Sequence, residues 1–129
     1  MPVENELHTR TECGISEDSR LLPAISAIVE QASMRIGMPD TRIRALILAS
    51  EHAFRRMCVK SNGNGHVLRV TCQDYDDRVE VTVEGPAASK TAADAAVIEL
   101  RDCVGRVIEE AQGENIRLTL TEFTGNNGR

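Results

Sequence analysis

Aromatic residues are almost missing from this sequence, which holds two Phe, one Tyr and no Trp among 129 residues. A core without them must be built from Val, Ile, Leu and Ala side chains. A surface without them cannot form the stacking platform on which single-stranded nucleic acids bind. Positive charge is also in short supply, because the formal net charge is −5 at pH 7, the wrong sign for a protein that binds phosphate backbones. We therefore expect no nucleic-acid partner.

The sequence also lacks a long apolar run. No stretch approaches the roughly 20 apolar residues that a membrane helix needs. Residues 1–17 carry four Glu and no apolar segment of the kind found in signal peptides. We therefore expect a cytoplasmic protein that makes no membrane contact.

Closely spaced cysteines are absent as well. The four Cys are far apart and form no Cys-x-x-Cys pair. In a reducing cytoplasm the simplest expectation is that all four are small buried apolar residues. A zinc site needs close pairs of ligands, and the nearest approach to one, Cys58 with His66 and Cys72, has a weak spacing. We predict no metal site.

The composition is otherwise that of one globular domain, with 41% apolar and 27% charged residues. Apolar and polar residues alternate in four segments, at 7–13, 68–72, 79–84 and 116–121, as expected for strands. Apolar residues recur at helical spacing at 21–36, at 43–58 and at 97–111. The predicted order is β-α-α-β-β-α-β.

This pattern predicts an α/β (α+β) two-layer sandwich. Each strand has one apolar face and each helix one apolar stripe, so we expect a mixed sheet of about four strands with three helices on one face. Six residues should then be buried: Ser50, Phe54, Val70, Val81, Leu100 and Val104.

Two short motifs stand at the ends of predicted elements. The second helix contains Ser50-Glu51-His52-Ala53-Phe54-Arg55, and the third strand closes as Val81-Thr82-Val83-Glu84-Gly85-Pro86-Ala87. Together with the order of the elements, these motifs resemble the histidine-kinase-like ATPase (GHKL) fold, and within it the anti-sigma-factor serine kinases. The resemblance covers roughly residues 7–123. It implies one histidine-kinase-like ATPase domain over 1–129, with flexible ends at 1–5 and 124–129.

The resemblance assigns a role to each motif position. In the family a Glu on the second helix activates the nucleophile, and an Asn four residues later ligates the magnesium of ATP; here these positions hold Glu51 and Arg55. In the family the strand closes with an Asp that binds adenine, followed by Gly-Pro-Gly. Here Gly85 and the following Pro match, whereas Val83 replaces the Asp and Ala87 replaces the second Gly.

These replacements predict a degenerate ATP pocket at Arg55, Val83, Gly85 and Ala87. Val83 offers no acceptor to adenine, and an unpaired buried donor costs about 1–3 kcal/mol. A guanidinium has no lone pair for magnesium, which needs oxygen ligands. Glu51 would be catalytic only if the chain is active, and its spacing from Arg55 equally suits a surface ion pair. We expect no cofactor, with ATP and magnesium bound only in the active alternative.

Three functions remain open at this point. The first is a regulatory protein-binding module resembling an anti-sigma factor that has lost ATP and kinase activity. Its partner would be a sigma factor or an anti-sigma antagonist, and it would form a homodimer through the open edge of strand 7–13 or through the first helix. The second is an active ATP-dependent anti-sigma-factor serine kinase with a diverged pocket. The third is an unrelated α/β sandwich.

Overall fold

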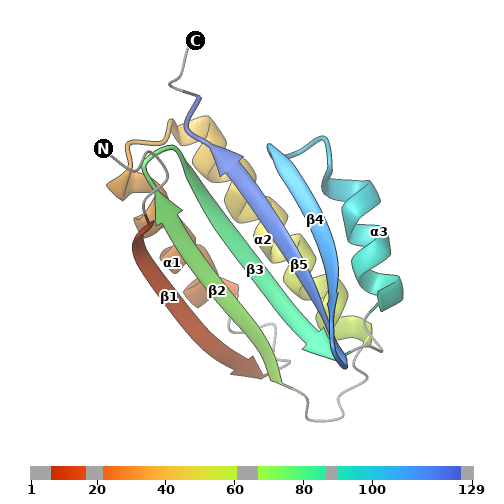
Figure 1. The fold of residues 1–129 in the computed structure, drawn as a ribbon. Helices are drawn as coiled ribbons and strands as arrows, with labels where there is room; N and C mark the ends of the chain where they lie inside the picture. Colours follow the sequence, from red (N-terminus) through yellow and green to blue (C-terminus); the bar gives the residue numbers. More distant parts are fainter. Residues whose placement is uncertain (1–6, 17–21, 61–66, 87–89, 126–129) are drawn as a thin grey trace.

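The computed structural model describes residues 7–16, 22–60, 67–86 and 90–125. Within these ranges the chain forms three helices and five strands (Figure 1). In chain order they are β1 (Leu7–Ser16), α1 (Leu22–Arg35), α2 (Asp40–Lys60), β2 (Val67–Tyr75), β3 (Arg78–Pro86), α3 (Lys90–Leu100), β4 (Arg106–Gln112) and β5 (Asn115–Phe123).

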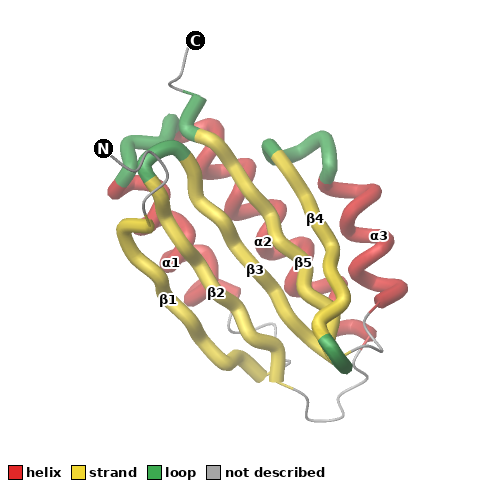
Figure 2. The backbone as a smooth tube through the Cα atoms, viewed as in Figure 1, coloured by secondary structure: helices red, strands yellow, loops and turns green. Residues whose placement is uncertain are grey.

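The strands form one sheet in the order β1-β2-β3-β5-β4, and every neighbouring pair is antiparallel. All three helices lie behind the same face of this sheet (Figures 1 and 2). The two-layer α+β sandwich with helices on one face is thereby confirmed. The described sheet has five strands where about four were predicted, and it is antiparallel where a mixed sheet was predicted.

The extra strand comes from the end of the predicted third helix. Helix α3 stops at Leu100, and residues 106–112 form β4 instead of continuing the helix to Ala111. The apolar residues there include the β-branched Val107 and Ile108, which suit a strand as well as a helix. Gly113, at φ 62°, then turns the chain into β5 as a hairpin. The helical spacing of the apolar residues at 104–111 was therefore misleading.

Gly105 lies directly before β4 rather than inside a helix. A Cβ at this position would come within 2.7 Å of the Phe123 ring, so the glycine permits close packing of β4 against β5. Its backbone N–H donates to Glu122 Oε1 at 2.8 Å.

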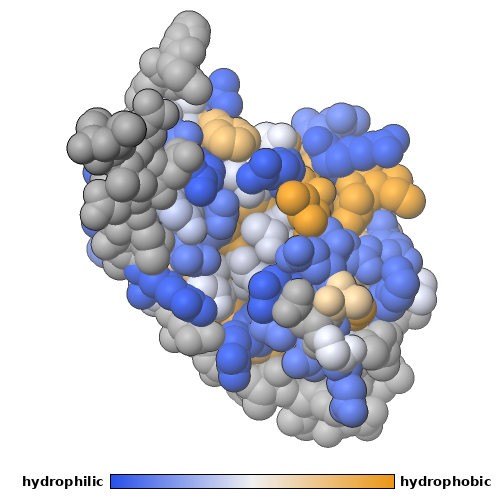
Figure 3. Space-filling view, in the orientation of Figure 1, coloured by the Kyte–Doolittle hydropathy of each residue, from blue (hydrophilic) through white to orange (hydrophobic). Residues whose placement is uncertain are grey.

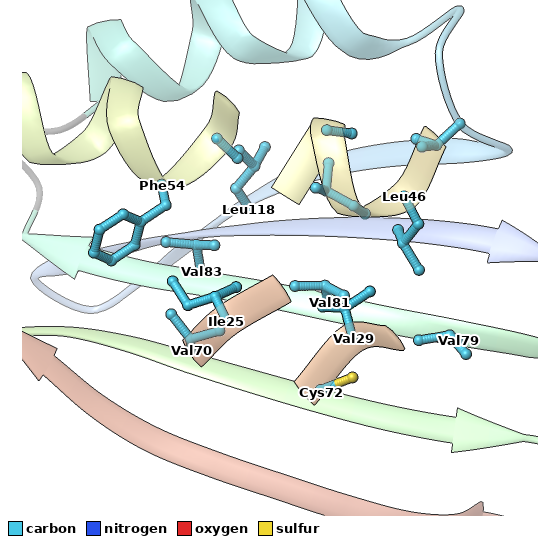
Figure 4. Packing of buried hydrophobic residues seen from close by; sticks show 14 of the residues in the cluster. Ile25, Val29, Leu46, Phe54, Val70, Cys72, Val79, Val81, Val83 and Leu118 are labelled. Atoms are coloured by element: carbon cyan, nitrogen blue, oxygen red, sulfur yellow. The ribbon is translucent and has the colours of Figure 1, made fainter. Parts of the chain in front are cut away.

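The core lies between the sheet and the helices. Alternate residues of β3, at 79, 81, 83 and 85, point toward the helices and are buried. Figure 4 shows Val79, Val81 and Val83 in contact range of side chains from α1, α2, β2 and β5. The prediction is confirmed for all six residues named above: Ser50, Phe54, Val70, Val81, Leu100 and Val104 are each 7% exposed or less.

Two buried carboxylates close one end of this core. Asp74 on β2 and Glu122 on β5 both pair across the sheet with Val79, so they occupy one row. Arg35 from the end of α1 bonds Asp74 at 3.0 Å, and Arg42 from the start of α2 bonds Glu122 at 3.0 Å. Each buried charge is thus neutralised by an arginine next to the α1–α2 connection, which fixes both helices over the sheet.

No helix among the described residues is long and apolar enough to cross a membrane. Of the ends predicted to be flexible, 1–5 and 126–129 lie outside the described ranges. Thr124 is buried, and its backbone N–H donates to Asp77 O at 3.0 Å.

Candidate functional site

Glu51 lies on the side of α2 that faces α1, and both of its carboxylate oxygens are engaged. The Ser26 hydroxyl of α1 donates to Oε2 at 2.5 Å. Arg55, one turn further along α2, approaches Oε1 at 3.9 Å. The predicted surface pair with Arg55 is therefore present, and the hydrogen bond with Ser26 makes Glu51 a link between the two helices. The Glu51 side chain is 21% exposed, so it still reaches solvent.

Arg55 is the more exposed member of this pair, with 57% of its side chain accessible. Its guanidinium carries only donors, so it can contact an anion but cannot ligate a metal. The position at which the resembled family holds magnesium thus carries a cation at the surface of α2.

Val83 lies in the sheet, on the face of β3 that the helices cover. It is 1% exposed, and its cross-strand neighbours are Val70 and Leu118. Figure 4 places the ring of Phe54 from α2 beside it. The described residues around Val83 are therefore apolar, and none of these named neighbours offers a side-chain acceptor to an adenine amino group.

Gly85 and Pro86 belong to the last residues of β3 and still pair with β5, opposite Ile116 and Asn115. Gly85 is buried, on the same face of the strand as Val83. Ala87, the remaining predicted pocket position, lies outside the described residues.

The predicted site residues therefore fall into two separate pairs. Glu51 and Arg55 form an ion pair near α1, and Val83 and Gly85 lie under the helix layer. No hydrogen bond or ion pair joins these two pairs in the described part of the chain. These side chains offer magnesium one carboxylate that is already bonded, and they offer adenine no acceptor, so they do not fit ATP with magnesium.

A cluster that the motifs did not reveal lies on the other side of α2. His52 Nε2 is 2.6 Å from Glu99 Oε1 of α3, and Arg56 donates to both oxygens of the same carboxylate. These hydrogen bonds, first that of Arg56 and then that of His52, lower the pKa of Glu99 to about 2. The i,i+4 spacing of His52 and Arg56 hinted at a shared acidic partner, but only the packing of α3 identifies it.

Of the four cysteines, the structure describes the side chains of Cys72 and Cys103, whereas those of Cys13 and Cys58 lie outside what it describes. Cys72 is buried as predicted, and its burial raises the pKa of the thiol to about 12. Cys103 is exposed, and the prediction of burial was wrong for this residue because it follows the end of α3 rather than lying inside a helix. Of the weak zinc pattern, His66 is outside the described residues. The described residues include no group of three His, Cys, Asp or Glu placed to hold a metal.

The uncovered face of the sheet is polar (Figure 3). It holds a shallow hollow of about 450 Å³. One row across it reads Arg69, Glu84, Arg117 and Glu110 from four adjacent strands, so charges of opposite sign alternate. A row of this kind neutralises itself and favours no ligand of one sign.

A second hollow of about 450 Å³ runs between α2 and α3. It is mostly apolar and is lined by Ala45, Leu48, Ala49, His52, Leu100 and Cys103, together with the carboxylate of Glu99. Neither hollow includes Glu51, Arg55, Val83 or Gly85.

Comparison with known proteins identifies a similar fold. No family model and no curated protein matches the sequence. Among solved structures, the crystal structure of the RsbU and RsbW domains of Rv1364c from Mycobacterium tuberculosis matches with a TM-score of 0.72 at 11% sequence identity. The match covers 89% of this chain and 32% of that chain, so this chain spans about a third of its neighbour's length. At this identity the likeness concerns the fold alone.

Proposed function

We propose that this chain is a regulatory protein-binding module of the anti-sigma-factor type that no longer uses ATP. The fold is similar to a structure that contains an RsbW domain, and RsbW is an anti-sigma-factor serine kinase of the histidine-kinase-like fold. The sequence motifs resemble the same family, over nearly the whole chain. Fold and motifs therefore support the proposal that this chain has the scaffold of that family. Whether it also has the family's chemistry depends on the residues at the site.

The observation that carries the loss of ATP chemistry is the apolar enclosure of Val83. In the resembled family a carboxylate at this position binds adenine, whereas Val83 packs against Phe54, Val70 and Leu118. An adenine amino group brought here would lose its water and gain no acceptor, which costs about 1–3 kcal/mol. Arg55 at the magnesium position adds electrostatic repulsion toward the metal.

A module of this kind acts by holding a protein partner, and the proposed partner is a sigma factor or an anti-sigma antagonist. We also propose that the chain works as a cytoplasmic homodimer. The outer edge of β1 carries no partner strand in the described sheet, and a free edge invites pairing with a second chain. Neither ATP nor magnesium has a role in this mechanism.

The second candidate is an active serine kinase, and the observation in its favour is Glu51. This residue keeps the family's position on α2 and is 21% exposed, so its carboxylate reaches solvent despite the bonds to Ser26 and Arg55. In that case Glu51 would take the proton from the substrate hydroxyl.

Affinity capture from lysate of the source cell tests the proposal. We expect the full-length chain to retain a sigma factor or an antagonist equally well with and without ATP and magnesium. Retention that requires ATP, or transfer of labelled phosphate to the captured protein that Glu51→Gln abolishes, would support the kinase instead. Capture of no protein above a bead control would contradict both.

A further inference from the structure

A groove crosses the uncovered face of the sheet, the face seen in Figure 3, at right angles to the strands. Its floor is a row of short side chains, and longer polar side chains stand on both sides of that row within the hollow of about 450 Å³. The floor residues are cross-strand neighbours on β2, β3, β5 and β4, namely Thr71, Thr82, Thr119 and Ile108. This cross-strand groove therefore spans four strands.

The two sides of the cross-strand groove are rows of side chains that also run from strand to strand. One side is the alternating row described above, with Arg69, Glu84, Arg117 and Glu110. The other side includes Gln73, Glu80 and Arg106. The two rows are four residues apart along each strand, which separates them by about 14 Å. An α-helix with its side chains is about 10–12 Å wide, so the groove has the width of one helix.

The charges of the alternating row are available to another molecule. Arg117 lies opposite Glu84 on one side and Glu110 on the other, yet no ion pair joins these three side chains. In the part of the chain that the structure describes, neither Arg117 nor Glu110 has a side-chain hydrogen bond or ion pair. Glu84 accepts one hydrogen bond, from Asn115 at 3.3 Å. Each of the three can therefore bond a group of opposite charge on a partner.

The spacing of this row selects the kind of segment that could carry the opposite charges. Neighbouring strands are about 4.8 Å apart, so the four charges span about 14 Å. Three turns of an α-helix cover about 16 Å, whereas six residues of an extended strand cover about 20 Å. A helix therefore stays in register with all four charges, and an extended segment does not.

We propose that the cross-strand groove docks a helix of the protein partner whose charges alternate in sign once per turn. This helix carries Glu and Lys in alternation at i, i+4, i+7 and i+11, so that each faces the opposite charge in the row. Its side toward the floor is made of small or apolar residues, which lie on the threonines and on Ile108, a side chain that is 40% exposed. A shift of the helix by one turn would place like charges together, so the row also fixes the register.

The inference rests on the proposed function, because it names the surface and the chemistry by which that partner is held. A row with no net charge attracts neither acidic nor basic proteins as a class. It discriminates by the order of charges, which is the property that the experiment must vary.

Two synthetic peptides of about 18 residues, near five helical turns, test this proposal directly. Both are alanine-based, have the same composition and are held helical by a hydrocarbon staple on the side away from the charges. The alternating peptide carries Glu, Lys, Glu and Lys at i, i+4, i+7 and i+11, and the sorted peptide carries Glu, Glu, Lys and Lys at the same positions. We expect the full-length chain to bind the alternating peptide at least tenfold more tightly at low ionic strength, with ¹⁵N NMR shifts centred on β2, β3, β5 and β4.

A charge-swapped variant of the full-length chain, Glu84→Arg with Arg117→Glu, tests the order of charges without changing the net charge. It turns the row into two positive charges followed by two negative ones, which complements the sorted peptide. We expect this variant to bind the sorted peptide at least tenfold more tightly than the alternating one. The matched control is Arg101→Asp with Asp102→Arg, because both residues are exposed and lie outside the hollow, and it should keep the original preference. Circular dichroism checks that each variant is folded.

The outcomes separate this inference from the proposed function. Equal affinity of the unaltered chain for the two peptides, no detectable binding of the alternating one, or a charge-swapped variant that keeps the original preference would overturn the groove as the docking site. If the charge-swapped variant captures the same sigma factor or antagonist as well as the unaltered chain does, the groove fails while the proposed function stands. If the unaltered chain captures neither, the proposed function itself fails.

Discussion

Val83 has apolar neighbours from three other elements, namely Val70 on β2, Leu118 on β5 and Phe54 on α2. The chemistry of the resembled family requires a carboxylate at this position. In the present core such a carboxylate would be buried against these three apolar side chains, none of which offers a cation or a donor. Valine at this position therefore suits the apolar side chains packed against it. Replacing Val83 alone by Asp would not create a site that binds adenine.

We expect Val83→Asp to destabilise the fold by about 3–5 kcal/mol, since an uncompensated charge would be buried. Val83→Thr, which keeps the shape and adds only a hydroxyl, should cost about 1–3 kcal/mol. Urea unfolding followed by circular dichroism measures both. An aspartate variant as stable as the unaltered chain, and able to bind ATP, would contradict this description of the site.

Glu51 shows how a motif residue can serve packing instead of chemistry. If its main role is to join α1 and α2 through Ser26, then Ser26→Ala and Glu51→Ala remove the same interaction. Each should lower the free energy of unfolding by about 1 kcal/mol, and the double variant should lose less than the sum. Additive losses would show that the two side chains act independently.

At the scale of elements, α3 is held against α2 and β4 by charged side chains. Arg56 and His52 bond Glu99 on one side, and Lys90 at the start of α3 bonds Glu109 of β4 at 3.1 Å on the other. Leu100 and Val104 add buried contacts at its end. Helix α3 is thus held at both ends.

The Glu99 cluster gives a prediction about pH. The pKa of Glu99 is about 2 in the folded chain, below its ordinary value of 4.5. A lowered pKa means that this interaction stabilises the fold above about pH 4.5 and is lost as the pH falls from 4.5 toward 2. The thermal midpoint should fall over this range, and it should fall less steeply in Glu99→Gln. Identical pH profiles for the two proteins would refute the role of the cluster.

The elements also show how far the sequence could predict the structure. Gly37 and the Pro39-Asp40 pair mark the end of α1 and the start of α2, because they act through local backbone geometry. The boundary between α3 and β4 could not be found in this way, since Val104, Val107 and Ile108 fit either period. Their state depends on the hairpin with β5, a tertiary contact.

The motifs select candidate positions, but they do not predict which side chains surround those positions in the fold. Glu51, Arg55, Val83 and Gly85 could be selected by the motifs alone. Ser26 lies 25 residues before Glu51, and Glu99 lies 43 residues after Arg56, so neither partner follows from local spacing. The apolar enclosure of Val83 likewise arises only when β2, β5 and α2 are packed together.

For the whole molecule, the open edge of β1 bears on its oligomeric state. The outer edge of this ten-residue strand carries no partner in the described sheet, whereas its inner edge pairs with β2 along its length. Pairing of two such edges about a two-fold axis would extend the sheet across both chains.

We therefore expect light scattering to give the mass of a dimer. A chain lacking residues 1–14 that keeps its helical circular dichroism should be monomeric. A full-length chain that is monomeric at high concentration, or a dimer that survives the truncation, would rule out an interface at β1.

The central claim, a histidine-kinase-like fold that binds proteins without ATP, is tested most directly by calorimetric titration of the full-length chain with ATP and magnesium. Two lost contacts of about 1–3 kcal/mol each, or about 4 kcal/mol together at the middle of that range, would weaken a micromolar site by about three orders of magnitude. We therefore predict a dissociation constant for ATP with magnesium weaker than about 1 mM, or no measurable heat. Micromolar affinity that depends on magnesium would contradict the claim and would establish a working nucleotide site.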